Sequence, residues 1–258
     1  IVYEIAVHAG GELYANISTQ SAGLASTGAF QTTLAGLQDA LFLKLNANGT
    51  RQWATYYGGS GSNGETGTGV CIMPNSDVCF YVMDMPPGFG TTGTFAPTTL
   101  SSDGMLTRFT ATGSRLWATY YHNGGGTICA DSKGNTYVVN VGTSSVYGTT
   151  TGAHQSSPGG NTDAIITKFG PTGNRLWATY YGGSFNDEVL NIACDAIGNV
   201  YIAGYTNSNN AIATTGSYQP TFNGTAGVAT NSLLVKFDST GIRQWGTYYS
   251  GSNSPVGY

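Results

Sequence analysis

Short runs of β-branched and aromatic residues, separated by glycine-containing turns, recur along the whole chain. In one stretch, the apolar run 189–194 is followed by the turn 195–199 and then by 200–205. A long loop leads to two further runs, 233–237 and 243–249. The Asp-x-x-Gly-Asn pattern of the turn suits a tight hairpin with glycine in the left-handed position. We therefore predict four short strands in this stretch. Since no segment shows helical periodicity over 11 or more residues, the fold class is predicted to be all-β.

The same four-strand unit occurs four times along the chain. The motif Arg-x-Trp-(Ala/Gly)-Thr-Tyr-Tyr occurs at 51–57, 115–121, 175–181 and 243–249, so that its tryptophans lie 60 to 68 residues apart. The turn before each copy also carries a glycine: Gly49, Gly113, Gly173 and Gly241. Self-similarity at a fixed period indicates a repeat architecture, in which each unit buries its faces against its neighbours. Four antiparallel strands in about 60 residues is the size of a β-propeller blade with one long loop.

The repeated motifs also resemble a known family. Asp-Ala-x-x-x-Lys-Phe, Trp-Ala-Thr-Tyr-Tyr-Gly-Gly-Ser, Asp-x-x-Gly-Asn-Val-Tyr-Ile-Ala-Gly-Tyr-Thr and Thr-Thr-Gly-x-Tyr-Gln together resemble the SBBP-type β-propeller repeat of bacterial secreted and surface proteins. The resemblance covers essentially all 258 residues. It implies a propeller and an envelope or extracellular address, and it brings no catalytic residues with it.

Blade boundaries follow from a second analogy, with NHL-type propellers, in which Ile-Ala-x-Asp lies on the innermost strand. We expect a single domain over 1–258, with blades at about 1–60, 61–123, 124–184 and 185–258. Four complete blades favour a closed four-bladed ring. The alternative is four blades of a larger propeller, because propellers of this repeat type are expected to be larger and no strand swap to close the ring is evident.

Composition narrows the classes of partner. Only 9% of the residues are charged, against about 25% in an ordinary soluble domain. A surface built from Gly, Ser, Thr, Asn and Tyr is common in extracellular β proteins. The net charge is −4 without a basic run, which argues against nucleic acid and anionic membranes as partners. No apolar stretch reaches the 18 or so residues of a membrane span. Because the chain begins at Ile1 without a signal sequence, we expect a mature or excised segment.

Nearly all cationic side chains occupy two repeated positions. Each pair is seven residues apart, and an Asp or Asn precedes the first member by five residues. A functional interpretation would make these a ring of ion-binding groups. A scaffold interpretation gives each blade the same ion pair or Arg–aromatic stack. Eight of the nine Lys and Arg residues belong to this set, which comprises Lys44, Arg108, Lys168, Lys236, Arg51, Arg115, Arg175 and Arg243, preceded by Asp39, Asp103, Asp163 and Asn231.

Candidate chemistry outside the repeat is sparse. His8, His122 and His154 occupy three different positions of the unit, which argues against a ring of metal ligands. Residues 59–64 spell G-x-G-x-x-G, but a strand follows where a dinucleotide site needs a helix. The adjacent acids Asp187 and Glu188 are the candidates for calcium, although neighbouring side chains on a strand point to opposite faces. We expect no resident metal and no cofactor.

The long loops offer better candidates for ligand binding. Loops at about 19–38, 85–102, 142–162 and 206–230 should lie on one side of the propeller, and the second repeat departs from the pattern at 83–87. Aromatic rings amid Thr, Asn and Gln suit recognition of glycans or proteins. The alternative is that each ring pins down its own loop. The candidates are Phe30, Phe89, Phe95, Tyr147, His154, Tyr218 and Phe222.

One cysteine pair has plausible geometry for a disulfide. Cys71 and Cys79 flank a predicted hairpin turn, and a bond needs their Cα atoms within about 7 Å. The alternative is two ordinary buried thiols. Cys129 and Cys194 should stay unpaired.

These patterns favour a non-catalytic structural or adhesive propeller at the cell surface or outside the cell, with itself or other cell-surface proteins as partners. Self-assembly is part of this hypothesis, as is glycosylation at the sequons of Asn16, Asn48 and Asn223. The alternative is a lectin-like propeller that binds glycans through the loop aromatics. A hydrolase or lyase ranks third, and paired carboxylates near the axis would favour it. The innermost strands offer Glu4, Glu65, Glu188 and the turn acids.

Overall fold

The computed structural model describes residues 1–258 except 62–63, 100, 102, 123, 143–146 and 252–258. The described residues contain no helix and form sixteen strands in four four-stranded antiparallel sheets. The prediction of an all-β fold with four four-stranded blades is therefore confirmed.

Each sheet takes four strands that are consecutive in sequence. The first sheet has the order β1 (Val2–Val7), β2 (Leu13–Thr19), β3 (Asp39–Leu45), β4 (Arg51–Tyr57). The second has β5 (Thr66–Ile72), β6 (Val78–Met85), β7 (Asp103–Phe109), β8 (Arg115–Tyr121). The third has β9 (Thr127–Ala130), β10 (Thr136–Gly142), β11 (Asp163–Phe169), β12 (Arg175–Tyr181). The fourth has β13 (Asp187–Cys194), β14 (Val200–Thr206), β15 (Asn231–Phe237), β16 (Arg243–Tyr249).

The third and fourth strands of each sheet form a hairpin, which we call the outer hairpin, with the same register in every sheet. The outer hairpin has one irregularity at the same place each time, which sets the repeated tryptophan opposite the repeated cation, as in Lys44 opposite Trp53 and Lys236 opposite Trp245. The turn glycine that precedes the tryptophan has a positive φ in all four copies, from 79° to 90°. Most L-residues with a Cβ rarely adopt that conformation, so the turn itself favours glycine.

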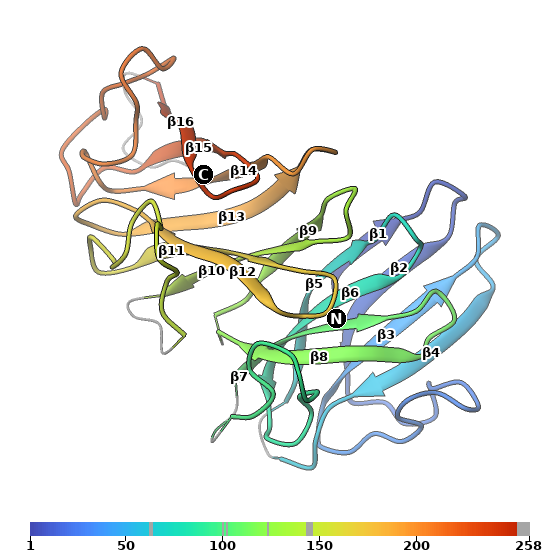
Figure 1. Ribbon diagram of the computed structural model, residues 1–258. Helices are drawn as coiled ribbons and strands as arrows, with labels where there is room; N and C mark the ends of the chain where they lie inside the picture. Colours follow the sequence, from blue (N-terminus) through green and yellow to red (C-terminus); the bar gives the residue numbers. More distant parts are fainter. Residues whose placement is uncertain (62–63, 100, 102, 123, 143–146, 252–258) are drawn as a thin grey trace. The chain divides into compact units, whose positions relative to one another are not determined.

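The chain divides into two compact units. The first comprises Ile1–Thr136 and Gly170–Asn174, and the second comprises Tyr137–Phe169 and Arg175–Tyr258. In the first unit, Figure 1 shows β1 to β4 side by side as one twisted sheet. A single domain over the whole chain stays a prediction, as does closure of four blades into a ring.

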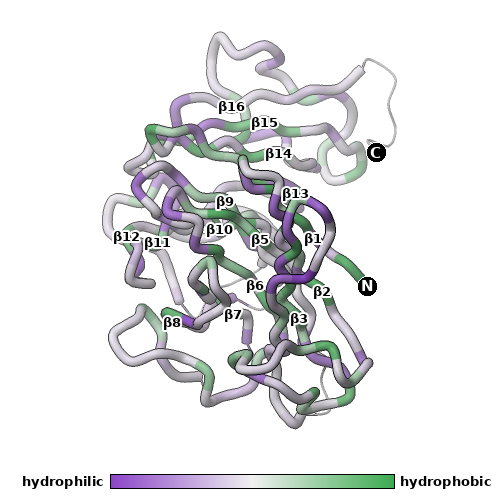
Figure 2. The backbone as a smooth tube through the Cα atoms, turned by 90° about the vertical axis from the view of Figure 1, so that its right-hand side faces the viewer, coloured by the Kyte–Doolittle hydropathy of each residue, from purple (hydrophilic) through white to green (hydrophobic). Residues whose placement is uncertain are grey.

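The core of the first unit lies where one sheet faces the next. Strand β5 lies against β1 and β2, and β9 lies against β5. The Phe42 and Phe80 rings from the first two sheets stack with centroids 4.0 Å apart, and the edge of Phe109 meets both rings. All three side chains are fully buried. Figure 2 shows hydrophobic residues concentrated along strands such as β6, whereas the long loops are mostly pale. Sheet-to-sheet junctions therefore form the core.

Candidate functional site

The repeated tryptophan of one sheet is hydrogen-bonded to the turn of the following sheet. Trp53 Nε1 donates to the carbonyl oxygen of Ala111 at 3.0 Å, and Trp177 Nε1 donates to that of Ser239 at 3.1 Å. Trp117 Nε1 donates to the Pro171 carbonyl in the same way at 2.8 Å. The three acceptors occupy one repeat position, the second residue after β7, β11 or β15. The motif is thus a junction between neighbouring repeats.

The repeated cation joins the tryptophan at the same carbonyl oxygen. Lys44 Nζ lies 3.3 Å from the Ala111 oxygen, and Lys168 Nζ lies 3.0 Å from the Ser239 oxygen. In the second sheet, Arg108 Nη1 reaches the Pro171 oxygen at 3.3 Å. Lys44 also lies over the Tyr14 ring, 5.2 Å from its centroid. The scaffold interpretation predicted an ion pair or an Arg–aromatic stack in each blade. The two lysines instead bind a turn carbonyl of the following repeat.

The turn glycine makes room for the tryptophan. A Cβ atom on Gly113 would lie 2.9 Å from Cδ2 of Trp53, and one on Gly241 would lie 2.9 Å from Cδ2 of Trp177. A Cβ on Gly173 would meet Trp117 equally closely, at 2.9 Å. Glycine is thus needed at this position for its conformation and for the close approach of the indole. We call the tryptophan, the cation, the turn carbonyl and the turn glycine the tryptophan junction.

Two of the loop aromatics predicted as ligand contacts, Phe30 and His154, pack between one repeat and the next. The Phe30 ring packs on Tyr57 of its own sheet and on Phe109 of the next, with centroids 5.6 and 6.1 Å away. The Arg115 guanidinium covers the same ring at 4.5 Å. His154 has the equivalent position between Tyr181 and Phe237, at 6.1 and 5.9 Å. Burial lowers the pKa of the His154 imidazole, which favours its neutral form.

The remaining loop aromatics are placed differently from one another. Phe89 packs on Tyr57 at 5.5 Å and Phe95 on Tyr121 at 6.3 Å. Phe222 meets the edge of the Tyr248 ring at 5.6 Å. The Tyr147 carbonyl accepts a hydrogen bond from Arg175. Tyr218 is the exception, because it stacks on Tyr249 at 5.6 Å but is 81% exposed. Ligand binding by any of the seven stays a prediction.

Two pairs of buried carboxyl groups also lie between successive sheets, one pair in each unit. In the first unit, Glu65 and Asp39 come from successive sheets. A Cβ atom on Gly58 would lie 2.7 Å from Glu65 Oε2 and 2.9 Å from Asp39 Oδ1, so both oxygens approach one point. Burial raises the pKa of Glu65 to about 7, with a smaller contribution from the Asp39 charge.

Asp163 and Asp187 form the equivalent pair in the second unit. Asp187 Oδ2 accepts hydrogen bonds from Gly183 N at 2.6 Å and from Ser208 Oγ at 2.9 Å. Asp163 Oδ2 accepts one from Gly159 N at 2.6 Å. Burial raises the pKa of both carboxyl groups, and the Asp163 charge adds to the effect on Asp187. Within the described structure, Asp163 Oδ1, Asp187 Oδ1 and Glu65 Oε2 are buried without a hydrogen-bond partner.

The acids predicted as a calcium candidate do not lie together. Asp187 is buried with Asp163, whereas the neighbouring Glu188 accepts a hydrogen bond from the Tyr205 hydroxyl on the other face of β13. Among the described residues, no group of three or more His, Cys, Asp or Glu side chains lies close enough to hold a metal ion. Sequence reasoning missed the pairing of Asp39 with Glu65 and of Asp163 with Asp187. The signal was the recurrence of an acid four to six residues beyond the Tyr-Tyr-Gly-Gly motif, at Glu65 and Asp187.

The cysteines and the remaining histidines have local contacts. Cys71 and Cys79 are direct cross-strand partners, as expected, but the structure has no disulfide between them. Cys79 Sγ lies 3.4 Å from the Thr136 hydroxyl oxygen. The structure shows the alternative of buried thiols. His8 binds Glu12 at 3.0 Å at the edge of its hairpin.

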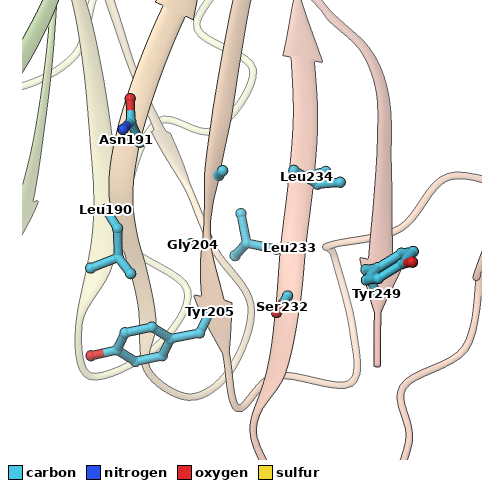
Figure 3. A pocket seen from close by; sticks show the side chains of 9 residues that line it. Leu190, Asn191, Gly204, Tyr205, Ser232, Leu233, Leu234 and Tyr249 are labelled. Carbon is cyan, nitrogen blue, oxygen red and sulfur yellow. The ribbon is translucent and has the colours of Figure 1, made fainter. Parts of the chain in front are cut away.

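One face of the last sheet carries an exposed apolar groove. Figure 3 shows a groove there, with a volume of about 680 Å³, which Leu190, Tyr205, Leu234 and Tyr249 line. Leu234 is 40% exposed and Tyr249 is 59% exposed. The residues at the equivalent positions of the first sheet, Phe42 and Tyr57, are fully buried against the second sheet. The groove therefore lies on the face of the last sheet that corresponds to the face of the first sheet packed against the second.

Comparison with known proteins agrees with this geometry. Residues 176–210 match the family model of the SBBP beta-propeller repeat. No curated protein matches the chain. Within the described part of the chain, no helix is long and apolar enough to cross a membrane. The matched residues run from β12 through β13 and β14, so the chain carries the SBBP β-propeller repeat that its motifs resemble.

Proposed function

We propose that this chain is a non-catalytic structural or adhesive propeller module that works at the cell surface or outside the cell. The proposal rests on the contacts that the repeated side chains make. Trp53, Trp117 and Trp177, with the cation opposite each, all bind the next repeat's turn. A chain whose most repeated chemistry joins one repeat to the next is built as a scaffold.

The surface supports the extracellular address. Charged residues are only 9% of the chain, and many Ser, Thr and Asn residues of the loops are exposed, although most of the tyrosines are buried. The repeated motifs of this chain resemble the SBBP-type repeat of bacterial secreted and surface proteins. Exposed apolar side chains such as Leu234 and Tyr249 give a surface on which a protein partner could pack.

Labelling of intact source cells with a membrane-impermeant amine reagent tests the address. The exposed Lys133 in the turn after β9 should react without cell lysis. A second assay measures adhesion of beads coated with the chain to the same cells. Protection from the reagent until lysis, together with no adhesion, would contradict the proposal.

A lectin-like role is the second candidate, and the stacked pair Tyr218 and Tyr249 favours it. Exposed aromatic faces of this kind suit the apolar face of a sugar ring. A glycan array, read with the wild-type chain and with Tyr218→Ala, separates the two functions. Binding that Tyr218→Ala abolishes would favour the lectin. Leu176→Gln, which removes another exposed side chain, is the matched control because Gln52 and Gln244 occupy that position in two other repeats.

Catalysis ranks last because of where the acids lie. The paired carboxylates that would favour a hydrolase or lyase are those of Asp39 with Glu65 and Asp163 with Asp187. All four residues are at most 1% exposed, so a substrate has no contact with them. We therefore propose a scaffold rather than an active site for these groups.

A further inference from the structure

Within the described residues, the tryptophan of the last repeat does not donate to a turn carbonyl as the other three tryptophans do. Trp245 is 38% exposed, whereas Trp53, Trp117 and Trp177 are 6% to 9% exposed. Lys236 lies over the Tyr201 ring at 5.2 Å, as Lys44 lies over Tyr14, so the donors already have the geometry of a filled junction. Within the described residues, neither Trp245 Nε1 nor Lys236 Nζ donates a hydrogen bond. We call Leu234, Lys236, Trp245 and Tyr249 the donor face.

The first repeat presents the matching turn, whose Ala47 carbonyl accepts no hydrogen bond within the described residues. Ala47 and Gly49 of the turn after β3 occupy the positions of Ala111 and Gly113. Gly49 has φ of 83°, which is within the range of the glycines in filled junctions, so the turn already has the docking conformation. A Cβ atom on Gly49 would meet nothing within 4 Å, where one on Gly113 would meet Trp53 at 2.9 Å. We call Leu45, Ala47, Gly49 and Arg51 the acceptor face.

The two faces are complementary in the details that the filled junctions share. In those junctions the indole fills the space above the glycine, and the two donors share the turn carbonyl. Arg51 donates to the Leu24 carbonyl at 2.7 Å, as Arg115 donates to Phe89, so it too is already positioned. It lacks only the aromatic ring that Phe30 gives to Arg115. Tyr218, which occupies the position of Phe30 in the last repeat, supplies that ring.

We propose that the donor face docks onto the acceptor face of a second copy of this chain, with Trp245 Nε1 donating to the Ala47 carbonyl. The inference rests on the proposed scaffold function and gives it a partner and a contact. Because the two faces are different, the contact is heterologous, and it makes a ring or an open chain according to the rotation at each step.

A mixing experiment tests the contact with two variants of the whole chain. Trp245→Ala removes the donor, and Gly49→Asn blocks the acceptor while tolerating a positive φ. Sedimentation velocity across a series up to high micromolar concentration should show association of the wild type. Each variant alone should associate more than about tenfold more weakly, because the indole is the central anchor. Mixed in equal amounts, the two should form a one-to-one dimer, since one intact donor and one intact acceptor remain.

The controls separate docking from general stickiness and from loss of fold. Leu176→Gln removes an exposed apolar side chain away from both faces, and its association should equal that of the wild type. Circular dichroism confirms that each variant is folded. A monomeric wild type at every concentration, or a mixture that does not recover the dimer, would overturn the inference. Cell-surface labelling and adhesion would still report on the proposed function separately.

Discussion

The first and last repeats carry almost the same outer strand, Arg-Gln-Trp-Ala-Thr-Tyr-Tyr and Arg-Gln-Trp-Gly-Thr-Tyr-Tyr, in very different surroundings. Trp53 is 8% exposed and hydrogen-bonded to the next sheet, whereas Trp245 is 38% exposed. Tyr57 is fully buried and Tyr249 is 59% exposed. The residues of this strand can therefore form a tryptophan junction, but the strand does not by itself bury the tryptophan. Burial comes from the turn and the aromatic ring of the following repeat.

Replacing each tryptophan by alanine should give the largest difference in unfolding free energy between the first and last repeats. Trp53→Ala should lower the free energy of unfolding by about 3–5 kcal/mol, because it leaves a cavity in the filled junction between the first two sheets. Trp245→Ala should cost less than about 1 kcal/mol when the protein is dilute, because its indole is partly in water. Urea denaturation of both variants at low protein concentration measures the difference. Equal losses would mean that both tryptophans are buried in solution.

Buried charge is a second difference between the first and last repeats. Asp39 of the first repeat lies close to Glu65, and the last repeat has no acid at the position of Asp39. Burial raises the pKa of Glu65 from 4.5 to about 7, so between those values the folded state holds a proton that the unfolded state has released. Unfolding free energy should therefore fall as the pH rises through this window. Asn231 stands where Asp39 begins β3, so the last repeat has a neutral amide at that position.

Glu65→Gln should remove this penalty. At about 1.4 kcal/mol for each pKa unit, the variant should gain about 3–4 kcal/mol over the wild type above pH 8 and little below pH 4.5. Urea denaturation at several pH values measures the difference, in which the titration of the other acids largely cancels. A difference that does not change with pH would refute the raised pKa.

The sequence alone predicted the strands and their grouping because both depend on local pattern. Turn glycines such as Gly113 and Gly241 mark the hairpins, and the period of the tryptophans marks the sheets. The scaffold interpretation of the repeated cations, Lys44 and Lys168 among them, followed from their regular positions. The structure supplied the acceptor carbonyls at Ala111 and Ser239.

The sequence did not predict how residues distant along the chain combine. Phe30 is a loop residue that is 42% exposed, yet its neighbours Phe109 and Arg115 come from the following repeat. Asp187 was grouped with the adjacent Glu188, whereas its neighbour in space is Asp163. Such pairs need the distance between repeats, which no local pattern contains.

The turn glycines offer a smaller test of the same comparison. Gly113→Asn should cost about 1–3 kcal/mol, because its Cβ would press on the Trp53 indole and the junction would be overpacked. Gly49→Asn places the same side chain at nearly the same φ, where nothing lies within 4 Å, and should cost less than about 1 kcal/mol. Thermal unfolding of the two variants at low concentration compares them. A large loss for Gly49→Asn would show that this turn is packed in solution.

The repeated lysines should give the smallest difference. Lys44→Met keeps an unbranched chain of similar length over the Tyr14 ring but removes the charge and the hydrogen bond to the Ala111 carbonyl. We expect a loss of about 1 kcal/mol, because Trp53 Nε1 still satisfies that carbonyl. Lys236→Met should change the free energy of unfolding by less than about 0.5 kcal/mol, since its ammonium group lies over Tyr201 without the second contact. Urea denaturation repeated in high salt identifies the origin of the Lys44 loss. A buried hydrogen bond should keep most of its contribution in high salt, whereas a loss that salt removes would indicate a screened surface charge instead.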